Sequence, residues 1–283
     1  MAPKITIIAG PTASGKSALA LQIAEKSGGV IINADSQQVY RELRILTARP
    51  TPEEEARAPH RLYGTMSAAE SCSAGQWLIF AKMEIDWALG QRLQPIVVGG
   101  TGLYLKALMQ GISAMPDIPP EVRAIAMSDY EMMGKEAFAA RLREIDAAFF
   151  ERLKVYDRQR LTRAYEIWLG SGKTLSWWQA QGATPPYPPE SFTVQKVELP
   201  REELYARCDA RVIGMVEQGA VEEVKSLLAL HLPDTLPAMK SVGVPEFSAY
   251  IREEMPLDQA ISKVQQSTRN YAKRQMTWLR NQL

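Results

Sequence analysis

The sequence holds few of the residues that bind metals or form disulfide bridges. Its 283 residues include 2 cysteines, Cys72 and Cys208, and 2 histidines, His60 and His231. The two cysteines lie far apart in sequence, and neither has the short spacing of a metal-binding pair. We therefore expect two reduced cysteines and neither a disulfide framework nor a zinc site.

Long apolar runs and an excess of one charge are also lacking. No stretch approaches the roughly 18 apolar residues of a membrane span, and the apolar run after Lys4 is too short for the core of a signal peptide. Lys and Arg number 33 against 32 Asp and Glu, a formal net charge of +1. Any nucleic-acid partner must therefore be held by local basic patches. These features predict a cytoplasmic protein without a membrane anchor.

What the sequence does contain is an alternation of strand and helix patterns. Its composition, 46% hydrophobic and 23% charged, is that of a globular protein. The β-branched runs that predict buried strands lie at residues 4–9, 30–33 and 95–100. The helical patterns between them lie at residues 17–27 and 75–93. This order predicts an α/β fold, a parallel sheet flanked by helices with ligands at the carboxyl ends of the strands.

One sequence motif predicts a phosphate site at that edge. Residues 10–17 fit the pattern G-x-x-x-x-G-K-[ST] between a predicted strand and a predicted helix, which is the context that a P-loop requires. The residues expected to bind a diphosphate or nucleotide are Gly10, Pro11, Thr12, Ala13, Ser14, Gly15, Lys16 and Ser17. Backbone N–H groups and Lys16 would hold phosphate oxygens, and the Ser17 hydroxyl could reach Mg²⁺.

The middle of the chain has a different character. Strand patterns vanish between about residues 112 and 191, a helical stretch bounded by proline-rich segments, and residues 192–199 alternate as a returning strand. We expect a P-loop NTPase-like core domain of residues 1–111 and 192–283, with a helical carboxyl part. Residues 112–191 are then an α-helical insertion domain.

The P-loop leaves the reaction class open. An NTP hydrolase of this type needs an aspartate after a second apolar strand, but the strand at 95–100 leads into Thr101. Asp35 ends another strand, where it could act as a base on an acceptor nucleophile, as in a small-molecule kinase or another transferase. Taken alone, Asp35 could equally be a turn or cap residue, and Thr101 a helix cap.

Further motifs resemble one enzyme family over nearly the whole chain. They are ADSQQVY at 34–40, TARP at 47–50, VGGTGLY at 98–104, Gln159-Arg160 with RAYE at 163–166, KSVGVPE at 240–246 and TRNYAKRQMTWLR at 268–280. With the P-loop, and in this order, they resemble the tRNA dimethylallyltransferases, also called tRNA isopentenyltransferases, in their short bacterial form. The combination is far more specific than a P-loop alone.

The resemblance implies a reaction and its partners. A dimethylallyl group would pass from dimethylallyl diphosphate to N6 of the adenosine 3′-adjacent to the anticodon of tRNA, with release of diphosphate. Mg²⁺ is the implied cofactor, with Ser17 as its protein ligand, and the tRNA anticodon stem-loop is the implied macromolecular partner. We expect no membrane and no protein partner, hence a monomer.

The same resemblance assigns roles to individual residues. It implies Asp35 as the catalytic base. Thr101 would line the site and contact the tRNA or the surroundings of Asp35, and Arg123 would contact the reacting ends of the substrates. The residues implied in tRNA binding are Asp35, Ser36, Gln37, Gln38, Thr101, Arg123, Gln159, Arg160, Leu161, Thr162, Arg163, Lys273 and Arg274. Taken singly, Arg123 would be a solvated helix charge.

Two basic patches could hold RNA on a nearly neutral protein. The first comprises Arg152, Lys154, Arg158, Arg160 and Arg163, with Asp157 as the only acid between them. The second lies on a predicted helix that carries Lys263, Arg269, Lys273, Arg274 and Arg280 and no acid after residue 262. At about 100° per residue, these five residues fall on one face and the apolar residues on the other. A solvated basic face without RNA is the alternative.

The chain departs from the family pattern at five positions and leaves three other functions open. Leu46 stands where a glycine is usual, and the other departures are Arg61, Gly64, Arg158 and Tyr165. The alternatives are a P-loop kinase of a small acceptor, an isopentenyltransferase that uses free adenosine nucleotides, and an RNA-binding module without catalysis. The last would leave Asp35 and the P-loop unexplained.

Overall fold

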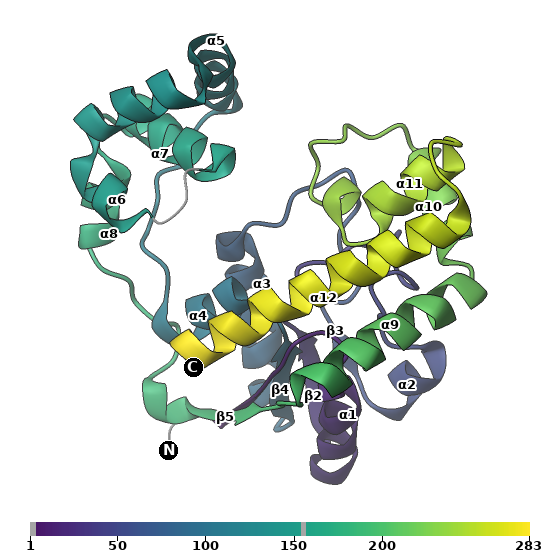
Figure 1. Cartoon of the computed structure of the whole chain (residues 1–283). Coiled ribbons are helices and arrows are strands. Elements are labelled where there is room, and N and C mark those ends of the chain that lie inside the picture. Colours follow the sequence, from purple (N-terminus) through teal and green to yellow (C-terminus); the bar gives the residue numbers. More distant parts are fainter. Residues whose placement is uncertain (1–3, 154–156) are drawn as a thin grey trace. The chain divides into compact units, whose positions relative to one another are not determined.

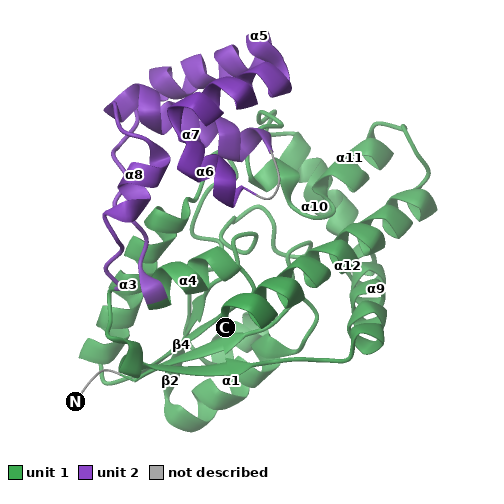
Figure 2. Ribbon diagram, turned by 60° about the vertical axis from the view of Figure 1, so that its left-hand side comes forward, with its two compact units in different colours: residues 1–109, 186–283 green, residues 110–185 purple. Residues whose placement is uncertain are grey.

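A computed structural model describes residues 4–153 and 157–283 (Figure 1), so Lys154 of the first basic patch lies outside the described residues. The chain divides into two compact units, which Figure 2 distinguishes by colour. Unit 1 comprises residues 1–109 and 186–283, and unit 2 comprises residues 110–185. Unit 2 differs in its limits from the expected insertion, 112–191.

A parallel sheet forms the centre of unit 1. Its strands are β1 (Ile5–Ala9), β2 (Gly29–Asn33), β3 (His60–Arg61), β4 (Gln94–Gly99) and β5 (Phe192–Lys196). They pair in the order β3-β2-β4-β1-β5, all parallel. The expected strands near residues 4–9, 30–33, 95–100 and 192–199 are confirmed. β3 was not expected, because two residues are too short to carry an alternating pattern.

Both faces of the sheet are covered, which explains why its strands are continuously apolar. Successive side chains of a strand point to opposite faces. Ile8, Ile31 and Ile96 contact the apolar side of α1 (Lys16–Ser27). Ile7, Ile32 and Val97 on the other face belong to the cluster that includes α3 (Ala74–Gly90) and α4 (Gly102–Gln110). The carboxyl ends of β1, β2 and β4 therefore open at one edge, where the P-loop and Asp35 follow their strands.

A helical layer completes unit 1 beside that edge. It consists of α9 (Arg201–Glu217), α10 (Ala220–Leu228), α11 (Val244–Ile251) and α12 (Leu257–Gln282), with α2 (Pro52–Arg57) and short 3₁₀ turns at Pro189–Ser191 and Ala238–Lys240. α9 and α12 lie side by side in Figure 1. Their apolar residues join the loop between β2 and α2 in a second core cluster.

Helix α12 has two distinct faces. The side chains that it buries recur every three or four residues: Ala260, Val264, Thr268, Ala272, Gln275 and Leu279. Lys263, Lys273, Arg274 and Arg280 are exposed, as the helical wheel predicts. Arg269 differs, because it is half-buried and forms an ion pair with Asp209 of α9. Four of the five basic residues expected on this face are thus exposed to solvent.

Unit 2 is helical throughout its regular structure. Its helices are α5 (Pro120–Ile145), α6 (Ala147–Arg152), α7 (Arg158–Ser171) and α8 (Leu175–Ala180). α5 is interrupted at Gly134, whose φ of 74° is not helical. Phe138, Leu142 and Leu161 are among the buried residues of its core, which forms between α5, α6 and α7. The expectation of a helical segment here is confirmed.

Candidate active site at the phosphate loop

The P-loop of residues 10–17 turns from β1 into α1. Gly15 adopts a φ of 90°, which side chains rarely allow, so this turn favours glycine. Lys16 is only 8% exposed, and its ammonium group donates a hydrogen bond to the carbonyl of Pro11 (3.3 Å). The first turn of a helix leaves N–H groups without intrahelical partners and carries positive potential. The local geometry is that of an anion cradle.

Burial sets the charge state of Lys16. Desolvation lowers the pKa of its ammonium group to about 8, nearby Asp35 opposes that shift, and the positive charge of Arg211 reinforces it. A group with this pKa holds its proton less firmly than an exposed lysine. An anion that arrives in the cradle would restore the charged form.

Asp35 sits at the end of β2 in a tightly bonded turn. Its backbone N–H donates to Asn33 Oδ1 (2.8 Å), and its own Oδ1 accepts the N–H of Gln37 (3.0 Å). Asn33 is fully buried and also donates to the carbonyls of Asp35 and Leu62. Asp35 is 7% exposed and lines a pocket. Asp35 therefore stabilises the turn and also lines the pocket.

Thr101 joins the end of β4 to the loop after β2. Its Oγ1 accepts the N–H of Ser36 (2.9 Å) and donates to Ser36 Oγ (3.2 Å), while its own N–H donates to the carbonyl of Ala34 (3.2 Å). The side chain of Thr101 thus bonds to Ser36 in the loop after β2 and does not cap α4. The backbone carbonyl of Thr101 accepts the N–H groups of Tyr104 and Leu105 in the first turn of that helix. The structure brings Thr101, Ser36 and Asp35 together.

Gln275 of α12 ties the P-loop to the end of β4. Its side-chain oxygen accepts the N–H of Thr12 (2.7 Å), and its side-chain nitrogen donates to the carbonyl of Gly100 (3.1 Å). A Cβ at position 100 would lie 2.2 Å from this nitrogen, so the contact requires glycine there. Gln275 is 5% exposed. The sequence analysis missed it, although a glutamine on the apolar face of a helix is a detectable signal.

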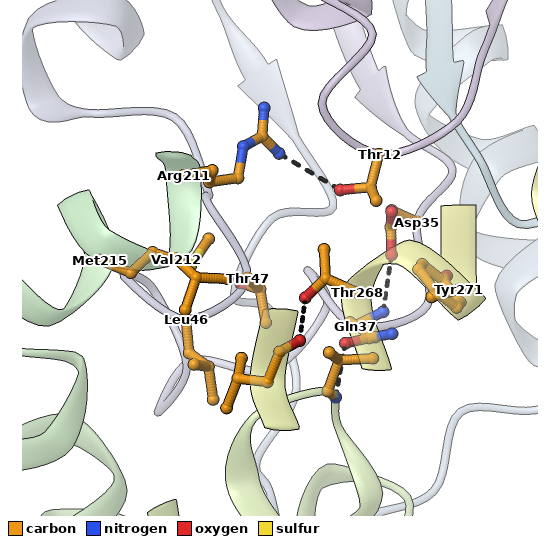
Figure 3. A pocket seen from close by; sticks show the side chains of 12 residues that line it. Thr12, Asp35, Gln37, Leu46, Thr47, Arg211, Val212, Met215, Thr268 and Tyr271 are labelled. Carbon is orange, nitrogen blue, oxygen red and sulfur yellow. Dashed lines mark hydrogen bonds between the residues drawn. The ribbon is translucent and has the colours of Figure 1, made fainter. Parts of the chain in front are cut away.

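A pocket beside Asp35 combines a charged end with an apolar end (Figure 3). Arg211 of α9 enters the charged end, where its guanidinium donates to Thr12 Oγ1 (3.2 Å). Burial lowers the pKa of the Arg211 guanidinium from its ordinary value. An arginine is nevertheless basic enough to stay protonated at neutral pH. The apolar lining consists of Leu46, Val212, Met215, Val242 and Val264. Arg211 is a second residue that the sequence analysis missed.

Tyr271 of α12 completes the wall between Thr101 and Gln37. Its hydroxyl interacts with both residues, and burial raises its pKa well above the ordinary value of 10. The phenol therefore stays protonated and able to donate a hydrogen bond. Thr268, one turn earlier on the same helix, also lines the pocket.

The two glutamines expected to contact RNA make backbone hydrogen bonds. Gln37 Oε1 accepts the N–H of Val242 (3.1 Å). Gln38 Nε2 donates to the carbonyls of Thr47 and Ala48, both at 2.8 Å. Both side chains thus hold the loops around the pocket in place.

The other predicted tRNA-binding residues, apart from Lys273 and Arg274 on the exposed face of α12, lie in unit 2. Arg123 of α5 and Arg163 of α7 both form ion pairs with Glu166, which is 4% exposed. Gln159 and Arg160 are exposed on α7, and Arg160 pairs with Asp157 (3.2 Å). The adjoining residues of α7 point inward, since Leu161 is fully buried and Thr162 donates to the carbonyl of Arg158 (2.9 Å). Arg158 pairs with Glu131, so acids of unit 2 offset much of this basic patch.

Fold and site together define a class of protein. A parallel α/β sheet carries a P-loop at the carboxyl end of β1, beside a buried carboxylate and a pocket with one cationic and one aliphatic end. Within residues 4–153 and 157–283, no helix is long and apolar enough to cross a membrane. This is a P-loop NTPase-like protein.

Comparison with known proteins identifies the family. Residues 38–282 match the IPP transferase family. The chain is 51% identical to the tRNA dimethylallyltransferase of Phenylobacterium zucineum, covering 100% of this chain and 91% of the relative. It is 50% identical to that of Nitrobacter hamburgensis, covering 98% of this chain and 87% of the relative. The protein belongs to the IPP transferase family.

Solved structures agree with this assignment. A tRNA delta(2)-isopentenylpyrophosphate transferase from Staphylococcus epidermidis has 30% identity and a TM-score of 0.69, covering 99% of this chain and 91% of that chain. A eukaryotic dimethylallyltransferase acting on tRNA has 26% identity and a TM-score of 0.84, covering 98% of this chain and 70% of that chain. The similarity extends over both units, including the P-loop that precedes the matched family region.

Proposed function

We propose that the protein is a tRNA dimethylallyltransferase that transfers a dimethylallyl group from dimethylallyl diphosphate to N6 of the adenosine 3′-adjacent to the anticodon. The main support for this function is the lining of the pocket shown in Figure 3. Its cationic end suits a diphosphate, its aliphatic end suits a short branched hydrocarbon, and the carboxylate of Asp35 lies along the same pocket. The names of the relatives independently support tRNA as the acceptor.

The P-loop and two cationic side chains bind the donor. Free N–H groups at the start of α1 and the ammonium group of Lys16 contact the diphosphate oxygens. Arg211 adds a second positive charge beside Thr12. As the bond to the prenyl carbon breaks, negative charge grows on the leaving diphosphate, and these groups stabilise that charge most strongly in the transition state.

Magnesium is part of the proposal. Ser17 is exposed at the start of α1, and the described residues contain no cluster of three or more His, Cys, Asp or Glu that could hold a metal by itself. In phosphate sites Mg²⁺ is commonly held by one or two protein oxygens together with substrate oxygens and water, so the Ser17 hydroxyl fits this role. The ion would neutralise charge on the leaving group.

Asp35 is the general base. An aromatic exocyclic amine is a weak nucleophile because its lone pair is delocalised, and removal of its proton strengthens it. N6 forms a bond to C1 of the dimethylallyl group, the C1–O bond breaks with its electron pair leaving on diphosphate, and the N6 proton passes to Asp35. The N–H of Gln37 donates to the carboxylate of Asp35, and the side chain of Asn33 holds the Asp35 backbone. Thr101 and the protonated Tyr271 line the acceptor side.

The RNA contacts come from both units. Lys273 and Arg274 on the exposed face of α12 bind phosphates, and Gln159, Arg160 and Arg163 of α7 contact the anticodon loop. Ser36, Gln37 and Gln38 shape the edge of the pocket where the target base enters. A role for Arg123 toward the substrates is implied by the family resemblance alone. Leu161 and Thr162 are buried residues of α7 and hold this helix against the core of unit 2. Unit 2 then acts as the tRNA-binding domain.

Every residue that lines the pocket belongs to unit 1. We also propose that the enzyme is a monomer. It acts in the cytoplasm, where tRNA is available.

A transfer assay tests the proposal against its alternatives. The purified protein is incubated with Mg²⁺, labelled dimethylallyl diphosphate, and either unmodified tRNA with an adenosine beside its anticodon or free AMP. Label on tRNA alone is the expected result. Label on AMP would identify an enzyme that uses free nucleotides, and consumption of ATP without prenyl transfer would identify a kinase or NTPase.

A further inference from the structure

The aliphatic end of the pocket is closed by side chains from several elements. Leu46 comes from the loop between β2 and α2, and Val212 and Met215 come from α9. Figure 3 places these three on the side of the pocket away from Asp35. We propose that Leu46 forms the end wall of this pocket and limits the prenyl donor to a five-carbon chain. This inference rests on the proposed function, which assigns the hydrocarbon part of the donor to this end.

The backbone at Leu46 is held firmly. One carboxylate, that of Glu223 on α10, accepts three consecutive N–H groups, from Arg44 (2.6 Å), Ile45 (2.8 Å) and Leu46 (2.9 Å). On the other side, Gln38 Nε2 donates to the carbonyl of Thr47 (2.8 Å). Charged hydrogen bonds of this kind are stronger than neutral ones. The loop therefore keeps its position when the pocket fills.

The side chain of Leu46 has no room to withdraw. It is 5% exposed and lies directly against the backbone of Gly243, where a Cβ would come within 2.6 Å of Leu46 Cδ1. Gly243 has a φ of 96° and precedes α11. Met215, which lies on the same side of the pocket, is unbranched and adapts easily to a ligand. Leu46 is thus the rigid part of the wall.

Leu46 separates the pocket from the core of unit 1. It belongs to the same apolar cluster as Leu43, which is fully buried and does not line the pocket. Truncation of Leu46 would join the space that it vacates to the pocket. Truncation of Leu43 would remove the same number of carbons within the same cluster, away from the lining residues.

The test compares donors of different length on unmodified tRNA. Dimethylallyl diphosphate, a homologue with one extra carbon at the end of its chain, and geranyl diphosphate are used with the wild-type protein, Leu46→Ala and Leu46→Val. One methylene in a rigid apolar pocket changes specificity by about 10- to 200-fold. We expect the wild-type ratio of kcat/KM for the five-carbon donor over its homologue to lie in that range. Leu46→Ala lowers the ratio at least ~10-fold, and Leu46→Val lowers it less.

Leu43→Ala is the matched control and should keep the wild-type ratio. Thermal unfolding establishes that each variant is folded, and Leu46→Val, which loses one carbon, serves if Leu46→Ala does not fold. An unchanged ratio in a folded Leu46 variant, or an equal change in Leu43→Ala, would overturn the inference alone. Absence of any transfer from dimethylallyl diphosphate by the wild-type protein would overturn the proposed function and this inference with it.

Discussion

The lowered pKa of Lys16 predicts that donor binding weakens above neutral pH. The ammonium group, with a pKa of about 8, is buried in the P-loop. Binding of a diphosphate requires its charged form, so protein that has lost this proton must take it up again when the donor binds. The dissociation constant of dimethylallyl diphosphate should therefore rise as the pH passes through about 8.

The size of the effect follows from the fraction of protein that carries the proton. For a pKa of about 8, about nine tenths of the free protein is protonated at pH 7 and about one tenth at pH 9. If only the protonated form binds, affinity falls about tenfold between these values, or about 1.4 kcal/mol. A lysine with the ordinary pKa of 10.5 would change affinity by less than about 5% over the same range.

Isothermal titration of the protein with a non-reactive thio analogue of the donor at constant Mg²⁺ measures this dependence. Lys16→Arg is the control, because a guanidinium stays charged throughout and should flatten the profile whatever its absolute affinity. The donor diphosphate itself is fully ionised across the upper part of the range. A flat profile for the wild-type protein between pH 7 and 9 would refute the reasoning.

Three further variants, the last with a control, test other parts of the protein. Asp35→Asn should lower the single-turnover rate by about 10²- to 10⁴-fold with little change in tRNA affinity, and an unchanged rate would remove the assignment of the base. Gln275→Leu leaves two buried backbone groups unpaired and should cost about 1–3 kcal/mol in urea unfolding while raising the KM for the donor; unchanged values of both would contradict the bridging role. Arg274→Gln should reduce the slope of log Kd for tRNA against log salt by roughly 0.7. Arg269→Gln is the control on the same helix: it breaks the ion pair with Asp209 and should lower the melting temperature. An equal slope for Arg274→Gln and the wild-type protein would exclude a phosphate contact.

The parts of the fold that the sequence predicted are those encoded by neighbouring residues. β-branched runs indicate β1, β2 and β4, and the P-loop pattern depends on eight consecutive residues whose backbone geometry is local. β3 exists only because residues 60 and 61 pair with β2. Its formation depends on tertiary contact, and two residues carry no periodicity of their own.

The missed site residues act across long separations in sequence. Gln275 and Arg211 reach Thr12 from 263 and 199 positions away. On a helical wheel that starts at residue 263, Gln275 falls at about 120°, inside the apolar arc of α12. A polar residue on a packed helix face indicates a buried hydrogen bond, but a helical wheel cannot identify the partner of that bond. Arg269 falls at about 240°, at the edge of the basic arc, which explains why it is half-buried and paired.

The bridge from Gln275 to Thr12 has a consequence for how the enzyme matures during synthesis. The ribosome makes the P-loop early, and domains fold as the chain emerges. The N–H of Thr12 nevertheless receives its partner only when α12 has left the ribosome, because that partner lies 263 residues later. β5, which flanks β1 in the sheet, also follows all of unit 2. A nascent chain that stalls before α12 therefore lacks the side chain that accepts the Thr12 N–H, so the P-loop reaches its final hydrogen bonding only after α12 has been made.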